Sequence, residues 1–419
     1  MSFSPVSLGT GLAVATLPAR LIRDGFRDEG ADRAPVLPEA LRTLEARFDV
    51  SVMDLPSGLT RIRVQVDGES DWTGTVSGTG IEFLPADGTA VDAELSADAE
   101  TWDQFATDPH SAMPAFRDGR LRVRRNVHLA VGFLAAASGE RGPERALFTR
   151  VETSAGELSV LSAGQGEPLI CLHGLGATKS SFLDTVSALS GERRVIAVDL
   201  PGFGDSDKPV RAAYDAPYFA RIVIELMDEL GIERADFAGN SMGGRVALEL
   251  GLSHPERVGR LVLLAPALAW LRGRHGRFLL KGPLTKLGFI QPAPRLIVDP
   301  LVRALVPNHD ENWIAAGIDE FLRAFLTPRG RVAFYESARN IYLDEPHGED
   351  GLWRRLEGLR PPAMFVWGNQ DQLVPIGFRR HVELALDSAR HVELECGHVP
   401  HVELPERTHA EISVFLGTA

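Results

Sequence analysis

Short apolar runs alternate with longer amphipathic stretches from about Glu157 to the C-terminus. This rhythm is typical of parallel strands joined by helical crossovers. The runs predict strands at 168–172, 194–199, 235–239, 260–265, 362–367 and 390–394, and the stretches between them predict helices such as 218–230, 245–253 and 405–415. The pattern therefore predicts a doubly wound α/β domain over residues 146–419.

The N-terminal third of the chain has a different pattern. Ile62, Val64 and Val66 alternate with polar residues, and glycines separate further short apolar runs at 72–76, 81–84 and 91–95. Such alternation predicts half-buried strands in an antiparallel meander. Helical periodicity follows at 97–105 and 127–137. We therefore expect an α+β domain over residues 1–145, joined to the second domain through the segment 139–143.

The alternation of strands and helices in the second domain is interrupted between about Leu268 and Pro361. Apolar and aromatic residues recur there at helical spacing, and no strand pattern is present. An insertion after the strand at 260–265 would lie over the carboxyl ends of the sheet, where open α/β folds bind their ligands. We therefore predict a helical cap over residues 268–361.

The strongest chemical signal is the segment Gly239-Asn240-Ser241-Met242-Gly243-Gly244, which separates a predicted strand from a predicted helix. Small residues two positions to either side of the serine allow the backbone to make a tight strand-to-helix turn. That turn exposes the hydroxyl at the end of the sheet and points a helix N-terminus at developing negative charge. Ser241 is the candidate nucleophile, and the alternative is a glycine-rich connector without a chemical role.

A serine nucleophile needs a base with a pKa near 7 and a group that orients that base. Asp371 follows the strand at 362–367, and His398 follows a glycine after the last predicted strand. The order serine, acid, histidine is the one this type of fold uses. Asp371 could instead cap the next turn. His401 is the alternative base, but it lies further from the strand end, so we expect it to pack locally.

A second glycine turn, His173-Gly174-Leu175-Gly176, follows the predicted strand at 168–172. It should lie beside the serine turn, because both follow strands of the same sheet. In this arrangement the backbone amides of Leu175 and Met242 form an oxyanion hole. His173 precedes the glycines, and we expect it to anchor the loop rather than to act as a base.

Composition excludes several other classes of function. The net charge of −13 disfavours sequence-independent binding to nucleic acid or an anionic membrane, and the short basic run at 120–125 is interpreted as a solvated strand edge. The two cysteines lack metal-ligand spacing and fit a reducing compartment. No apolar run approaches the roughly 18 residues of a membrane span. The apolar segment 6–17 has no preceding Lys or Arg, which argues against a secretory signal, so we expect a cytoplasmic protein. We also expect no metal or organic cofactor.

From about Thr149 onward the sequence resembles α/β-hydrolases of the esterase and lipase group with a helical cap. The resemblance rests on LICLHGLGATKSSF, VIAVDLPGFGDSDKP, FAGNSMGGRVALEL, FVWGNQDQLVP and CGHVPHVELPE. It implies a mostly parallel eight-stranded sheet flanked by helices. It also implies cleavage of apolar esters through an acyl-enzyme on Ser241, with His398 as the base and Asp371 as its orienting acid.

Family resemblance leaves the bond that is cut open. The segment 239–244 also resembles the elbow of carbon–carbon hydrolases that act on ring-cleavage products. Those enzymes usually carry a tryptophan directly after the catalytic histidine, whereas this chain has Val399, which favours an ester. Acyl transfer to an acceptor other than water would use the same acyl-enzyme. A serine at the elbow argues against the carboxylate nucleophile of dehalogenases and epoxide hydrolases.

The N-terminal domain resembles the sterol carrier lipid-binding fold through VDAELSADAETWDQFATDP and AFRDGRLRVRRNVHLAVGFLAA. This resemblance implies a site for a lipid or sterol and no catalytic group. The alternatives are an accessory domain that binds nothing, and a whole protein that binds lipid but is catalytically idle. The presence of three triad candidates and two glycine turns argues against the idle protein. The sequence leaves the oligomeric state open.

Overall fold

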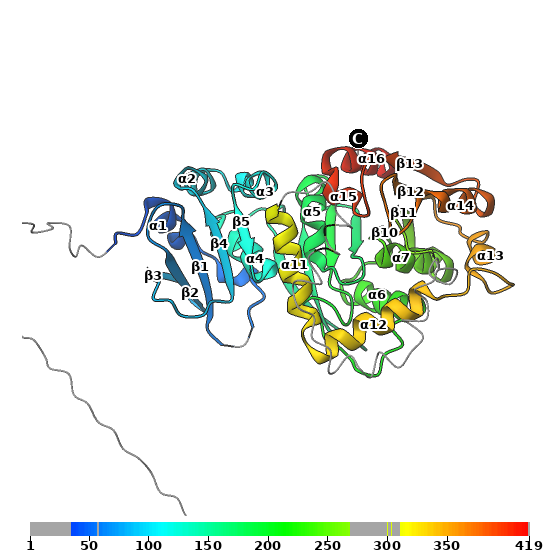
Figure 1. The fold of residues 1–419 in the computed structure, drawn as a ribbon, viewed down its shortest axis with the longest axis horizontal. Helices are drawn as coiled ribbons and strands as arrows, with labels where there is room; N and C mark the ends of the chain where they lie inside the picture. The colour runs from blue at the N-terminus through cyan, green and yellow to red at the C-terminus, as the bar shows by residue number, and fades with distance from the viewer. Residues whose placement is uncertain (1–34, 57, 269–299, 301–302, 304–310, 418–419) are drawn as a thin grey trace, which may run out of the picture. The chain divides into compact units, whose positions relative to one another are not determined.

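The computed structural model describes residues 35–56, 58–268, 300, 303 and 311–417 (Figure 1). Residues 37 onward belong to one compact unit that contains two β-sheets. The apolar segment 6–17 and the first part of the predicted cap, residues 269–299, lie outside the described residues. The first sheet lies within residues 60–124 and the second within residues 147–394, and the segment 139–143 lies between them along the chain.

The N-terminal sheet has five strands in the order β3-β2-β1-β4-β5. Its strands are β1 (Thr60–Val66), β2 (Trp72–Ser77), β3 (Gly80–Pro85), β4 (Ala93–Ala97) and β5 (Arg122–Arg124). Strands β1, β2 and β3 form the predicted antiparallel meander. The prediction was wrong for β4, which pairs parallel with β1, Ile62 lying opposite Ala93. Alternation shows which face of a strand is buried, but it does not reveal the neighbouring strand or its direction.

The described part of this small α+β domain also contains the helices α1 (Glu39–Ala46), α2 (Ala99–Thr107), α3 (Ala112–Arg117) and α4 (Val127–Ala137). Helix α4 begins where the Asn126 side chain accepts a hydrogen bond from the Leu129 amide. It is apolar on nearly all sides and most of its residues are buried. It packs against β4 and β5 and also contacts β6 of the second sheet, so it touches both sheets.

The second sheet has eight strands in the order β13-β12-β11-β10-β8-β9-β7-β6. They are β6 (Leu147–Thr153), β7 (Gly156–Ala163), β8 (Pro168–Leu172), β9 (Arg194–Val198), β10 (Ala235–Asn240), β11 (Val258–Leu264), β12 (Ala363–Gly368) and β13 (Arg390–Leu394). Neighbours from β13 to β9 are parallel, and the hairpin β6–β7 is antiparallel. The predicted mostly parallel sheet is confirmed.

Helices cover both faces of this sheet. One apolar core joins the sheet to α6 (Ala216–Glu229), α7 (Met242–Ser253) and α14 (Arg379–Ala385). A second core on the other face joins it to α5 (Leu183–Leu189) and α16 (Pro405–Leu416). Burial on both faces explains why these strands are nearly continuous apolar runs. The fold is therefore doubly wound, as predicted.

The described part of the predicted cap lies between β11 and β12 and is helical. It consists of α11 (Glu311–Phe325), α12 (Pro328–Tyr342) and the short α13 (Leu352–Leu356). Thr327 begins α12 by accepting a hydrogen bond from the Gly330 amide, with Pro328 in the first turn. The pair α11 and α12 runs past both the N-terminal sheet and the helices of the larger domain (Figure 1).

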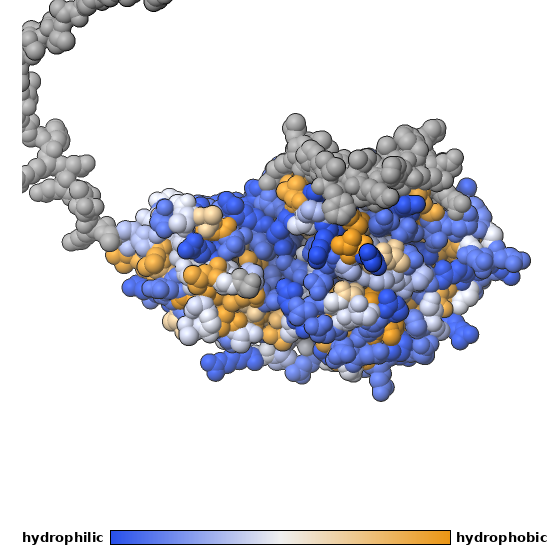
Figure 2. Space-filling view, turned by 90° about the horizontal axis from the view of Figure 1, so that it is seen from below, coloured by the Kyte–Doolittle hydropathy of each residue, from blue (hydrophilic) through white to orange (hydrophobic). Residues whose placement is uncertain are grey.

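Polar side chains join the two domains along several contacts. Arg124 of β5 pairs with Asp319 of α11 at 2.7 Å, and Arg117 of α3 pairs with Glu406 of α16. On the face shown in Figure 2, apolar side chains form scattered patches on a mostly hydrophilic surface. Within the described ranges, no helix combines the length and the hydropathy that crossing a bilayer requires.

Candidate active site

Ser241 occupies the turn between β10 and α7. Its backbone has φ 52° and ψ −112°, a region that residues other than glycine rarely adopt. Its amide donates to the Leu264 carbonyl at 2.9 Å, and its carbonyl accepts from the Ala267 amide at 2.9 Å. Neighbouring backbone on β11 and beyond therefore holds the serine in a strained conformation of the kind found at functional sites.

The glycines around Ser241 are required by packing. A Cβ atom at Gly239 would lie 2.4 Å from the Gly243 carbonyl oxygen, and one at Gly243 would lie 1.9 Å from the Leu172 carbonyl oxygen. The first turn of α7 thus lies directly against β8 and β10. This close approach is the one predicted from the spacing of small residues around the serine.

The structure brings Asp371 and His398 together. Asp371 Oδ2 lies 2.8 Å from His398 Nδ1, and both side chains are buried. Asp371 Oδ1 accepts hydrogen bonds from the amides of Leu373 and Val374 at 2.7 and 2.9 Å. Asp371 thus makes both contacts that its position in the sequence suggested. One oxygen caps its own loop, and the other faces His398.

Two residues that sequence analysis did not single out hold the histidine loop. Asn240 Nδ2 donates to the carbonyl oxygens of His398 and Leu264, each at 3.0 Å. Glu403 accepts from the amides of Gly397 and Val399 at 2.9 and 3.2 Å. The residue before the serine thus ties the serine turn to the histidine loop. The position of Asn240 inside the segment 239–244 is the feature of the sequence that could have indicated this contact.

His401 has different surroundings from His398. It is fully buried, and its ring stacks on Phe182 with centroids 4.5 Å apart. Burial lowers the pKa of His401 to about 3, so its ring is neutral at physiological pH. The structure places it in local packing, which is where the sequence prediction put it.

The second glycine turn lies against the serine. A Cβ at Gly174 would lie 3.4 Å from Ser241 Cβ, and His173 anchors the turn through Nδ1 to the Gly174 carbonyl at 2.7 Å. The Leu200 amide donates to His173 Nε2 at 3.0 Å, and burial lowers the pKa of His173. The amide of Met242 opens α7 and has no acceptor within the helix. The 173–176 turn and the start of α7 thus both lie beside Ser241.

The cap supplies aromatic groups to the same end of the sheet. The Tyr342 hydroxyl lies 3.0 Å from Ser241 Oγ. A Cβ at Gly176 would lie 2.8 Å from the Phe321 ring and 3.1 Å from that of Phe334. Phe321 stacks on Phe325 at 5.0 Å, and Phe325 meets Phe334 edge to face at 5.2 Å. Sequence analysis placed these residues in the cap without assigning Tyr342 a contact to Ser241.

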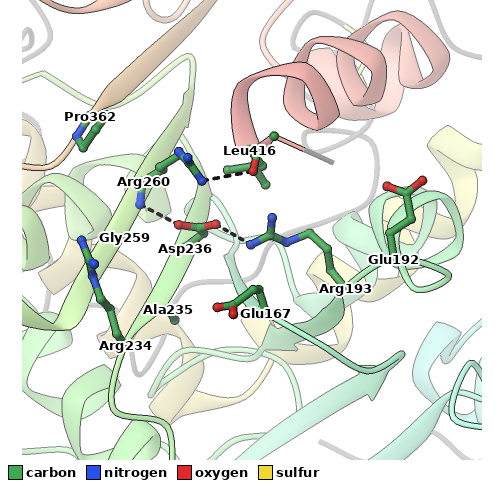
Figure 3. Close-up of a pocket in the computed structure, with 11 residues that line it drawn as sticks. Glu167, Glu192, Arg193, Arg234, Ala235, Asp236, Gly259, Arg260, Pro362 and Leu416 are labelled. Carbon is green, nitrogen blue, oxygen red and sulfur yellow. Dashed lines mark hydrogen bonds and ion pairs between the residues drawn. The ribbon is translucent and has the colours of Figure 1, made fainter. Parts of the chain in front are cut away.

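A polar cleft of about 430 Å³ lies at the opposite end of the sheet (Figure 3). Asp236, near the start of β10, pairs with Arg193 and accepts from the Arg260 amide at 2.7 Å. The Arg260 side chain donates to the Leu416 carbonyl at 3.1 Å. These contacts tie α16 to the amino ends of β10 and β11. No group of three or more His, Cys, Asp or Glu that could hold a metal occurs among the described residues.

The fold, with a serine elbow, a buried acid–histidine pair and a cap, defines an α/β-hydrolase architecture. Residues 167–405 match the family described as alpha/beta hydrolase fold, and residues 31–138 match the SCP-2 sterol transfer family. The chain therefore belongs to the α/β-hydrolase fold family and carries an N-terminal domain related to sterol carriers.

Relatives in this family differ in the reactions their names describe. The chain is 32% identical to the dihydrolipoyllysine-residue acetyltransferase component of the acetoin cleaving system of Pseudomonas putida, over 51% of this chain and 55% of that protein. It is also 32% identical to a 2-hydroxy-6-oxononadienedioate/2-hydroxy-6-oxononatrienedioate hydrolase of Paraburkholderia phymatum, over 50% of this chain and 73% of that one. A hydrolase is the class of enzyme these comparisons support.

Among solved structures, a bacterial membrane phospholipase A is similar to this chain with a TM-score of 0.57. The two are 27% identical, and the match covers 70% of this chain and 93% of the phospholipase. The chain spans only about half the length of the acetyltransferase component.

Proposed function

We propose that this protein is a serine hydrolase that cleaves carboxylic esters of apolar substrates through an acyl-enzyme on Ser241. The observation that carries the proposal is the convergence at one end of the sheet. A strained serine turn is linked through Asn240 to the loop of His398, and Asp371 holds Nδ1 of that histidine at 2.8 Å. A serine, a base and an orienting acid are the minimum set for nucleophilic acyl transfer.

In the proposed reaction His398 Nε2 takes the Ser241 proton while Oγ attacks the ester carbonyl carbon. The amides of Leu175 and Met242 donate hydrogen bonds to the oxyanion, and Asp371 stabilises the imidazolium. The imidazolium then protonates the leaving oxygen, and the alcohol departs. Water, activated by the same histidine, hydrolyses the acyl-enzyme and regenerates the serine.

An apolar substrate is supported by the described part of the cap. Phe321, Phe325 and Phe334 form an aromatic cluster beside the oxyanion turn. Two of the described arginines on these elements are engaged in ion pairs, since Arg323 of α11 pairs with Asp205 at 2.6 Å and Arg245 of α7 with Glu249 at 2.9 Å. Each buried methylene contributes about 0.8 kcal/mol, so kcat/KM should rise with acyl length until the pocket is full.

The second candidate is hydrolysis of a carbon–carbon bond in a ring-cleavage product, which the Paraburkholderia relative favours by its name. Such a dienedioate carries two carboxylates. The described arginines Arg323 and Arg245 already pair with carboxylates of the protein, which argues against their binding this substrate. Acyl transfer, favoured by the name of the Pseudomonas relative, would share the acyl-enzyme but replace water with another acceptor.

The test is a comparison of turnover by purified protein on p-nitrophenyl esters of increasing acyl length and on a 2-hydroxy-6-oxo-dienoate. We expect ester hydrolysis that rises with chain length and disappears in Ser241→Ala. Faster turnover of the dienoate would establish the carbon–carbon reaction instead. Activity highest on acetate and falling steadily with length would contradict an apolar acyl site.

For the N-terminal domain we propose that it binds a lipid. A cavity of about 320 Å³ lies on its helical side, lined mainly by apolar side chains of α2, α3 and α4. Leu183 and Val186 of α5 in the hydrolase domain complete the lining. The match to sterol transfer proteins supports a lipid as the occupant. A lipid bound here would raise the local concentration of poorly soluble substrate without supplying a catalytic group.

Displacement of a fluorescent fatty acid measures this binding. Ala135 is buried and lines the cavity, so Ala135→Trp should fill it and abolish binding. Ala90→Trp, the same change at an exposed loop position, should bind normally. Equal binding by both variants would contradict the assignment. Binding without turnover of any ester would leave the idle lipid-binding protein as the correct description.

A further inference from the structure

Tyr342 is the cap residue that reaches the nucleophile. It ends α12, only 5% of its surface is exposed, and its hydroxyl oxygen lies 3.0 Å from Ser241 Oγ. This is an ordinary hydrogen-bond distance between two hydroxyls. A group at this distance from the attacking oxygen is also within reach of the atoms bonded to the carbon that it attacks.

Ion pairs fix the tyrosine relative to the serine. Asp344, two residues beyond Tyr342, pairs with Arg245 in the first turn of α7 at 2.7 Å. Arg245 is fully buried and also pairs with Glu249, which in turn pairs with Arg355. The end of α12 is therefore clamped onto the helix that begins at Ser241. These ion pairs hold the Tyr342 hydroxyl in a fixed position, and such preorganisation is how hydrogen-bond donors contribute to catalysis.

The direction of the hydrogen bond follows from proton accounting. Burial is the main cause that raises the pKa of Tyr342 to about 12, and Asp371 adds to it, so the phenol is protonated at neutral pH. Ser241 gives its own proton to His398 as it attacks, so its oxygen accepts from Tyr342. A donor on Oγ weakens the nucleophile, and the hydrogen bond has to move to another oxygen as the new carbon–oxygen bond forms.

In the proposed reaction the oxyanion already has two amide donors, from Leu175 and Met242. Once the Ser241 oxygen is bonded to the carbonyl carbon, the other oxygen within reach of the Tyr342 hydroxyl is the leaving oxygen of the ester. His398 delivers its proton to that same oxygen.

We propose that Tyr342 is a catalytic residue that donates a hydrogen bond to the leaving oxygen of the ester as the tetrahedral intermediate collapses. The inference rests on the proposed function. The bond between the carbonyl carbon and the leaving oxygen breaks, the imidazolium of His398 supplies the proton, and the alcohol departs. Tyr342 keeps its own proton throughout and disperses the charge that develops on the leaving oxygen. An ester with a basic leaving alcohol therefore depends on the tyrosine more than one with an acidic leaving phenol.

The experiment compares two butyrate esters that differ only in the leaving group, p-nitrophenol and ethanol, in wild type and Tyr342→Phe. The substitution removes the hydroxyl and keeps the ring. A single donor to developing charge is worth about 100-fold or more in kcat. We expect about 100-fold loss of kcat for ethyl butyrate, a much smaller loss for p-nitrophenyl butyrate, and little change in KM for either.

Tyr218→Phe is the matched control. Its ring packs on Tyr214 and Phe219, and its buried hydroxyl has no hydrogen-bond partner among the described residues. It should leave both esters unaffected. Equal losses on the two esters in Tyr342→Phe would assign Tyr342 a packing role and overturn the proposal, as would wild-type or raised activity. Wild-type protein that turns over neither ester would overturn the proposed function together with this one.

Discussion

His398 and His401 lie in adjacent turns but face different environments. His398 meets a carboxylate, whereas His401 stacks on Phe182 and stays neutral because burial lowers its pKa to about 3. His398→Ala should reduce kcat on p-nitrophenyl butyrate by about 10⁵-fold or more, the scale found for loss of a triad base. His401→Ala should keep most of kcat and lower the free energy of unfolding instead. A larger loss of kcat in His401→Ala would show that the base is misassigned.

Asp184 provides a pH prediction at the level of one residue. Burial raises the pKa of this carboxyl to about 7, while Arg117 opposes the shift. In the unfolded chain the pKa is near 3.9. Between about pH 4 and 7 the unfolded chain therefore loses this proton while the folded protein keeps it. The stability that Asp184 contributes is full below about pH 4 and falls as pH rises toward 7.

Asp184→Asn cannot ionise, so its Tm relative to wild type should become steadily more favourable from pH 4.5 to 7.5. Asp118→Asn is the control, because Asp118 is an exposed carboxylate at the C-terminal end of α3, directly after Arg117. A Tm difference for Asp184→Asn that does not change with pH would contradict the buried, protonated carboxyl.

Sequence located the residues at strand ends and missed those that act across the fold. Ser241, Asp371 and His398 each follow a strand, and strand ends of a parallel sheet converge. Tyr342 lies 101 positions from the serine it touches, and helical periodicity shows an apolar face without showing which side chain reaches Oγ. Glu403 holds the backbone of the histidine loop, a contact that no spacing rule reports.

At the scale of elements, two glycines in helices have opposite requirements. A Cβ at Gly243 would lie 1.9 Å from the Leu172 carbonyl oxygen, whereas one at Gly317 in α11 would meet only the Trp313 ring, at 3.8 Å. Gly317→Ala should therefore stabilise the protein by about 0.5–1 kcal/mol through lower backbone entropy in the unfolded chain. Gly243→Ala should prevent the elbow from forming, with loss of activity and stability. Urea unfolding checks both, and a stable, active Gly243→Ala would refute the close approach of α7 to β8.

Some helices and strands could be predicted from the sequence, and others could not. Buried parallel strands such as β12 are continuous apolar runs, and α4 has the bounds that its periodicity indicated. The hairpin of β6 and β7 was not recognised, because β6 is a half-exposed strand with a mixed pattern. The parallel pairing of β1 with β4 depends on a chain path that alternation does not encode.

At the scale of the whole molecule, a buried ionic cluster joins both domains and the cap. Lys179 lies 2.6 Å from Asp199 and 3.5 Å from Asp205, and Arg323 of α11 pairs with Asp205. His128 of α4 approaches the same Asp205 at 3.7 Å. The N-terminal domain thus reaches Lys179, in the loop that follows the 173–176 turn, through side chains that are mostly buried.

Lys179 and Asp199 are 1% and 0% exposed, so removing one charge leaves the other uncompensated. Lys179→Met should lower the free energy of unfolding by about 3–5 kcal/mol. Arg379→Ala, which breaks an exposed pair with Glu383, should cost less than about 1 kcal/mol. Denaturant titration measures both, and similar small effects would show that the cluster is not a joint between the domains.

The most direct test of the account is the identity of the residue that carries the acyl group. An alkyl p-nitrophenyl phosphonate mimics the tetrahedral intermediate and leaves an adduct that does not turn over, so peptide mapping by mass spectrometry can locate it. We expect one phosphonyl group per chain on Ser241, matching loss of ester hydrolysis, and none in Ser241→Ala. An adduct on a different residue, or undiminished ester hydrolysis in Ser241→Ala, would contradict the account.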